Sequence, residues 1–199
     1  FSEERLVERY NVDLGNTLGN LLNRTLSMTH RYVSGKLAIV SSLPPEVKNS
    51  IANAVESYVK FMDARAVGGE LATKSPAHAA DEVQSQRALG AIGVILSLAS
   101  FVNRSIERIA PWQLAKSGQY DGVNHVLYVA TEALRIIAIL ISPVLPKAAH
   151  GMFDQLNWKM DPELAGKEER FSLAEAEWGK LPDGHVVGKP TPLFPRIEA

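Results

Sequence analysis

The chain has 199 residues, enough for one well-packed hydrophobic core but few for two ordinary domains. Its 46% hydrophobic and 22% charged residues are typical of a globular protein and exclude the composition of a disordered chain. The net charge is −1, so any nucleic-acid site must be a local feature of the surface. The absence of cysteine excludes a disulfide framework, a thiolate nucleophile and a cysteine-ligated zinc from this chain.

The sequence shows no sign of a membrane segment or a signal peptide. The most apolar run, Ala88 to Val102, is shorter than the roughly 18 to 20 residues that span a bilayer, so we interpret it as a buried helix. The start at Phe1 has neither an initiator methionine nor the basic and then apolar plan of a signal peptide. We therefore expect a chain that begins inside a longer protein, has no membrane partner and is cytoplasmic.

Apolar periodicity predicts an amphipathic helix near the start of the chain. The helix is expected to begin at Leu14, with Asp13 as its cap, and to end at Ser34-Gly35 or at the pair Pro44-Pro45. Its apolar residues have the spacing of one helix face, and they are Leu14, Leu18, Leu21, Leu22, Thr25 and Met28.

A second helix is expected to begin at Pro44 or Pro45, since proline is well tolerated in the first turn of a helix. Its inward residues are Val47, Ile51, Val55, Tyr58, Val59 and Met62. The segment Ala64 to Ala80 is rich in Ala, Gly, Ser and Pro and has no sustained apolar period, which predicts a loop.

Three more helices are expected in the following part of the chain. A long helix from Asp81 to Ala110 ends at Pro111, because proline disfavours helix in the preceding residue, and this places Trp112 at a corner. After a turn between Gly118 and Gly122, the remaining two helices are predicted over Val123 to Ile141 and Pro143 to Leu156.

These elements predict an all-α fold. No segment shows convincing strand alternation, and apart from one loop the turns are short, which favours an antiparallel bundle of about five helices over residues 1–157. Residues 158–199 are rich in Pro, Gly and charge, with one short helical patch near Glu168 to Glu177. We expect this irregular C-terminal tail to pack back on the bundle.

The first predicted helix carries an unusual polar face, made of Asn16, Asn20, Asn23, Arg24, Ser27 and Arg31. Asparagine is a poor helix former, so several on one helix call for an explanation. Asn20 and Arg24 are one turn apart, and an amide beside a guanidinium suits recognition of the edges of splayed bases. Alternatively, these residues form a solvated face or bond to adjacent helices, and spacing alone favours this second interpretation.

Trp112 is a second candidate, because an indole at a proline-broken corner can offer a stacking plane to an unpaired base. Tryptophan is nevertheless more often a packing residue. Nearby, Arg104, Arg108 and Lys116 outnumber Glu107, and this local positive bias suits phosphates, although a local excess of charge is usually only surface.

Catalytic motifs are missing from the sequence. Neither the GxGxxG nor the GxxxxGK[ST] phosphate loop occurs, and Gly15 with Gly19 forms a GxxxG that we interpret as close helix packing in water. No metal site is predicted, because the histidines lack metal-ligand spacing; they are His30, His78, His125, His150 and His185.

Three segments together resemble one family, the methionyl-tRNA synthetases. They are RYNVDLGNTLGNLLNRTLSM from Arg9 to Met28, RIAPWQLAK from Arg108 to Lys116, and PLFPRIE from Pro192 to Glu198. The first resembles the opening of the family's anticodon-binding bundle, the second its Ala-Pro-Trp corner, and the third the end of its core enzyme. The segments occur in the family's order, so the joint match covers nearly the whole chain.

The resemblance implies a site that recognises the CAU anticodon of tRNA(Met). The family uses an asparagine and an arginine one turn apart and a tryptophan that stacks on an anticodon base, and these positions hold Asn20, Arg24 and Trp112 here, with Pro111 shaping the corner. The supporting contacts that we expect are Asn16, Asn23, Arg104, Arg108 and Lys116. The chain departs from many relatives at Ser105, where they have an aromatic residue, and in the Ala64 to Ala80 loop, which has no clear family counterpart.

The resemblance also implies that the catalytic half lies outside this chain, since no HIGH-like or KMSKS-like string occurs. We expect no cofactor here; ATP, Mg and zinc would belong to the missing catalytic domain, which is the second expected partner in a parent methionine-tRNA ligase. Two alternatives remain, namely the anticodon-binding domain of a leucine, isoleucine or valine enzyme, and a helical protein-interaction module without RNA binding.

Overall fold

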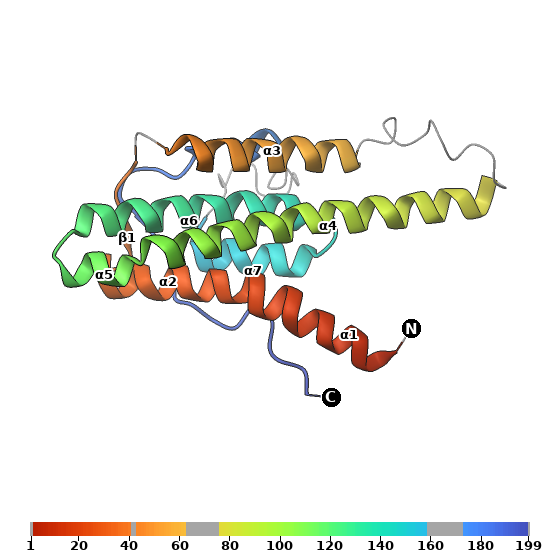
Figure 1. Ribbon diagram of the computed structural model, residues 1–199, viewed down its shortest axis with the longest axis horizontal. Coiled ribbons are helices and arrows are strands. Elements are labelled where there is room, and N and C mark those ends of the chain that lie inside the picture. Colours follow the sequence, from red (N-terminus) through yellow and green to blue (C-terminus); the bar gives the residue numbers. More distant parts are fainter. Residues whose placement is uncertain (1, 41–42, 63–75, 159–172, 199) are drawn as a thin grey trace.

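The computed structural model describes residues 2–40, 43–62, 76–158 and 173–198, with the backbone alone for 76–88. Within these ranges the chain forms an antiparallel bundle of long helices that pack side by side (Figure 1). The predicted all-α fold is confirmed. The chain crosses the bundle repeatedly and returns along its surface as an irregular tail (Figure 1).

The first long helix is composite. It runs through α1 (Glu3–Arg9), the π-helical segment η1 (Tyr10–Gly19) and α2 (Asn20–Val33) without a break. The prediction that it begins at Leu14 with Asp13 as cap is wrong: Ser2 caps it by accepting from the backbone N–H of Arg5 at 3.3 Å, and Asp13 pairs with Arg9 at 2.8 Å. Apolar periodicity could not show this start, because α1 has no buried residue.

The composite helix ends at Ser34-Gly35, which is one of the two predicted ends. Ser34 and Gly35 both adopt the left-handed conformation, with φ of 57° and 77°, and the Gly35 N–H bonds to the carbonyl of Thr29 at 3.0 Å. A left-handed residue after the last turn is a common helix stop, because it satisfies an orphan carbonyl.

Helices α3 (Pro45–Met62) and α4 (Pro76–Ile109) form the next layer. The start of α3 at Pro45 is confirmed. The predicted start of α4 at Asp81 is wrong, because the helix already includes residues 76–80, where a proline in the first turn and three alanines favour helix. The rest of the predicted loop lies outside the described residues.

The chain turns sharply after α4 and continues as α5 (Pro111–Lys116), α6 (Tyr120–Ile141) and α7 (Pro146–Leu156). The predicted corner is confirmed: Ala110 has a φ of 51° and Pro111 occupies the first helical position. The last two helices begin three residues away from their predicted starts, α6 earlier because it extends into the expected turn and α7 later because its first helical residue is Pro146.

Helix α6 is the axis of the core. Two described helical segments are long and apolar enough to cross a membrane by length and composition. They are Leu89–Lys116, which combines most of α4 with α5, and Tyr120–Ile141, which is α6. However, 89% of the apolar window of the second is buried inside the bundle, as expected for a core helix. Its apolar side chains pack against those of the surrounding helices in one continuous cluster.

The tail adds a small element that the sequence did not suggest. Strand β1 (Lys36–Leu37) pairs antiparallel with β2 (His185–Val186), with Lys36 opposite Val186. A strand of two residues is too short for an alternation of apolar and polar residues to be recognised in the sequence. In the predicted helical patch, Leu173–Ala176 form a 3₁₀ turn, and residues 168–172 lie outside the described part of the chain.

A buried ion pair on α6 holds the tail. Glu132 and Arg135 are fully buried, and the guanidinium Nη2 lies 2.8 Å from Glu132 Oε1. Arg135 also donates to the carbonyls of Glu175 and Glu177, while Glu132 accepts from the backbone N–H groups of Gly179 and Lys180 at 2.8 and 2.9 Å. The described part of the tail therefore packs on the bundle, and the domain boundary after residue 157 stays a prediction.

Candidate nucleic-acid interface

Arg24 and Trp112 meet at the corner between α4 and α5. The Arg24 guanidinium lies over the Trp112 ring, 5.4 Å from its centroid, in a cation–π contact. The same guanidinium forms an ion pair with Glu107 of α4 at 2.5 Å. Trp112 is half-buried against the core, and Pro111 is buried beneath the corner. Contacts with Glu107 of α4 and with Trp112 at the corner thus fix the orientation of the Arg24 side chain on α2.

Asn20 lies beside this pair, one helical turn before Arg24, and its side chain is exposed. It is the first residue of α2, directly after the π-helical segment. Asn16 and Asn23 are also exposed, and the Asn23 amide oxygen accepts from the Ser27 hydroxyl at 3.4 Å. The predicted polar face therefore lies at the surface, with its amides accessible to a ligand.

The predicted basic residues differ in whether they form an ion pair. Arg104 and Lys116 are exposed, and no ion pair involves them within the described residues. Arg108 instead pairs with Glu46 of α3 at 3.6 Å, whereas its neighbour Glu107 pairs with α2. Arg104 and Lys116 are thus the free cations closest in sequence to the corner, and Arg108 is tied to another helix.

Sequence reasoning missed the role of Glu107, which it counted only as a charge. Its signal was present, since Glu107 is one turn after Asn103, and two polar residues at this spacing share one face of a helix. Asn103 donates its Nδ2–H to the carbonyl of Thr17 at 3.0 Å. This face of α4 therefore contacts the polar helix at two points.

The tail packs on the other side of the π-helical segment. Phe194 lies against Gly15 and Gly19, and a Cβ at Gly19 would be 3.3 Å from the Phe194 ring. The expected close packing at the GxxxG is thereby confirmed, with the tail as the partner. Phe194 also makes an edge contact with Tyr10, with centroids 6.1 Å apart. The π-helical segment and the closing PLFPRIE segment are therefore neighbours in space.

Ser105 forms part of an apolar cavity near the corner. The cavity has a volume of about 60 Å³ and lies between α3, α4 and α6. The Ser105 hydroxyl donates a hydrogen bond to the carbonyl of Phe101, one turn earlier in α4, at 2.9 Å. Ser105 thus lines a small cavity while the Pro111 corner remains formed.

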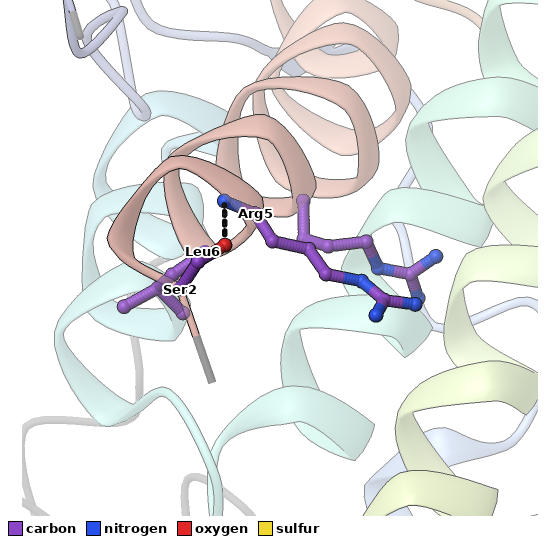
Figure 2. Close-up of a pocket in the computed structure, with 4 residues that line it drawn as sticks. Ser2, Arg5 and Leu6 are labelled. Carbon is purple, nitrogen blue, oxygen red and sulfur yellow. Dashed lines mark hydrogen bonds between the residues drawn. The ribbon is translucent and has the colours of Figure 1, made fainter.

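A second hollow lies along α1, at the end of the molecule opposite α5 (Figures 1 and 2). Among the described residues it is lined by Ser2, Arg5, Leu6 and Arg9. Figure 2 shows the Arg5 N–H donating to the Ser2 hydroxyl within the first turn of this helix. These residues include no general base or nucleophile pair, so the hollow offers no catalytic arrangement.

Comparison with known proteins decides the family. Residues 46–199 match the family model for the anticodon-binding domain of methionyl-tRNA ligase. The chain belongs to this family. Curated methionine–tRNA ligases from Nostoc sp. and Enterococcus faecalis are 33% and 35% identical to the domain over 100% of its length, which is 34% and 26% of theirs. The domain thus spans about a third or less of these relatives.

Solved structures agree with the sequence comparison. Methionyl-tRNA synthetase from Mycobacterium tuberculosis in its free state superposes with a TM-score of 0.74 at 26% identity, over 100% of the domain and 35% of that enzyme. The same enzyme bound to methionyl-adenylate gives a TM-score of 0.72 over 98% of the domain. The family model begins at residue 46, so the helix that carries Asn20 and Arg24 lies outside that match and is covered instead by the full-length relatives and the solved structure.

Proposed function

We propose that the domain recognises the CAU anticodon of tRNA(Met) on the surface formed by Asn20, Arg24 and Trp112. The observation that carries the proposal is the position of Arg24. It lies over the Trp112 ring and is held by Glu107, one turn from the exposed Asn20. Unpaired RNA bases are typically recognised by a stacking ring with hydrogen-bonding side chains beside it, and the corner offers this combination.

The ion pair gives Arg24 a defined orientation before RNA arrives. A guanidinium has donors in a rigid plane, and Glu107 occupies some of them while the exposed Asn20 amide remains available. An anticodon base that stacks at Trp112 places its edge near these groups. A wrong base leaves a desolvated donor or acceptor without a partner, which costs about 1–3 kcal/mol per group.

Phosphate contacts are proposed for Arg104 and Lys116, with Asn16 and Asn23 as further polar contacts on the helix face. Both cations are exposed and lie outside the ion pairs described above. Arg108 contributes only if it releases Glu46. Few cations take part, so the affinity should fall only moderately with salt compared with strongly basic RNA-binding proteins.

The remaining functions are proposed for a longer parent protein. The relatives are methionine–tRNA ligases of about three to four times this length. We propose that a catalytic domain with ATP, Mg and zinc lies in the part that this chain lacks, and that the parent charges tRNA(Met) in the cytoplasm. The role of this domain is then to present the correct tRNA.

The test compares Arg24→Ala with the wild-type chain. We expect Arg24→Ala to weaken binding of a CAU anticodon stem-loop about tenfold or more, because a hydrogen bond to a charged group is worth about 1.5–3 kcal/mol. Fluorescence anisotropy with the CAU stem-loop and with a stem-loop of altered anticodon measures both affinity and discrimination.

The matched control is Arg5→Ala, which removes the same charge from an exposed position on α1 at the opposite end of the bundle (Figure 1). Its affinity should equal that of the wild type. Unchanged affinity and discrimination in Arg24→Ala would contradict the assignment. Absence of RNA binding by the wild-type chain, together with a mass that depends on concentration, would support a protein-interaction module instead.

A further inference from the structure

We propose that Asn103 of α4 is a positioning residue for anticodon recognition, because it holds the π-helical segment in the geometry that directs Asn20 outward. The proposal rests on the function proposed above. Asn103 does not contact the anticodon in this account. It acts through the backbone of Thr17, three residues before Asn20.

The π-helical segment η1 determines where Asn20 points. The backbone N–H of Asn20 bonds to the carbonyls of Gly15 and Thr17, so this residue closes the last π turn and opens α2. Segments of this kind are rare and are frequent at functional sites. A shift of the closure by one residue would turn every following side chain by about 100° around the helix axis. The anticodon face of α2 therefore depends on the register of the segment.

Asn103 fixes that register at its last turn. Its Nδ2–H donates to the Thr17 carbonyl, which also accepts from the Asn20 N–H. The Thr17 hydroxyl meanwhile donates to the carbonyl of Val12, five residues earlier on the same segment, at 3.2 Å. Thr17 is thus bound on both sides, to α4 and to its own helix.

The orientation of the Asn103 amide follows from its partner. Because a carbonyl can only accept, the amide must present its nitrogen to Thr17. The Asn103 side chain is thereby fixed against the backbone of the π-helical segment.

Two side chains of α4 hold the segment around Asn20. Asn103 and Glu107 lie one turn apart on the same face of α4, and they bind Thr17 and Arg24, on either side of Asn20. From the tail, Asn11 and the backbone of Ile197 exchange hydrogen bonds of 2.9 and 3.0 Å, and Phe194 packs on Gly19. The π-helical segment is therefore held by α4 and by the tail.

A double-mutant cycle in the full chain tests the proposal. Asn103→Ala is expected to weaken binding of the CAU stem-loop about fivefold to tenfold, the range of one lost polar contact. In the Asn20→Ala background the same change should have a smaller effect, because one of the side chains that Asn103 positions is already absent. In the Trp112→Ala background its full effect should remain. A purely structural residue would weaken binding equally in all three backgrounds.

The control is Ser105→Ala, which removes a hydrogen bond within the same helix and should leave binding unchanged. If Asn103→Ala does not fold, Asn103→Leu, which has a similar side-chain volume and lacks the donor, replaces it in the cycle. Equal effects with and without Asn20, no effect at all, or loss of folding in both variants would overturn the positioning role. Failure of the wild-type chain to bind the CAU stem-loop would instead overturn the proposed function.

Discussion

A Glu132→Ala variant is expected to lose about 3–5 kcal/mol of unfolding free energy, the largest effect of any single change considered for this domain. The substitution leaves the Arg135 guanidinium fully buried without its counter-charge, and arginine cannot be deprotonated to relieve this. It also removes the acceptor of the Gly179 and Lys180 N–H groups. Urea unfolding followed by circular dichroism measures the loss.

A surface ion pair of the same tail provides the control. Glu177 and Lys180 pair at 3.4 Å with Glu177 well exposed, so Glu177→Ala should change stability by less than about 1 kcal/mol. The double variant Glu132→Leu with Arg135→Leu removes both charges and should be more stable than Glu132→Ala. Equal stability of Glu132→Ala and Glu177→Ala would show that the buried pair does not hold the tail.

A Trp112→Ala variant is expected to show the largest loss of RNA affinity. Stacking of a base on an aromatic side chain is worth about 1–3 kcal/mol, so the CAU stem-loop should bind roughly 5- to 150-fold more weakly. Arg24 also loses the ring over which it lies, which adds to the loss. Titration with a labelled stem-loop measures the affinity.

Trp112→Phe is the companion variant, because it keeps an aromatic plane at the corner and should bind with intermediate affinity. Thermal unfolding of both variants separates a binding defect from a folding defect, since Trp112 is partly packed against the core. Trp112→Ala with wild-type affinity and a normal melting curve would remove the stacking role from this residue.

The parts of the fold that depend on local chemistry could be predicted from the sequence. Pro111 fixes the corner because proline acts on its immediate neighbour, and Ser34-Gly35 ends a helix because glycine favours left-handed backbone. The mostly apolar run from Val123 to Ile141 located α6, and most of the residues of this helix are buried. These signals act within a few residues, so one sequence is enough to show them.

Features that depend on distant contacts could not be predicted. The start at Glu3 was missed because apolar periodicity reports burial, and α1 is exposed. The π-helical segment is held by Asn103 and by the tail, whose residues lie 86 or more positions away. No local pattern distinguishes such a segment from an ordinary helix.

The candidate site was chosen by family resemblance more than by physics. Spacing alone favoured a solvated face for Asn20 and Arg24, and the structure shows Asn20 exposed, as that interpretation also requires. The contact of Arg24 with Trp112 joins residues 88 positions apart, which spacing cannot reveal. The family resemblance therefore assigned these residues to one site, which their spacing in the sequence did not.

The hydrogen bonds between Asn11 and Ile197 join residues 186 positions apart, and this has a consequence for the order of folding. Direct closure of so long a loop is entropically costly and slow. The buried anchor at Glu132 and the β1–β2 pairing bring the chain close first, so that only the segment from Gly188 onward remains to close. The support that the tail gives to the π-helical segment should therefore form last and open first.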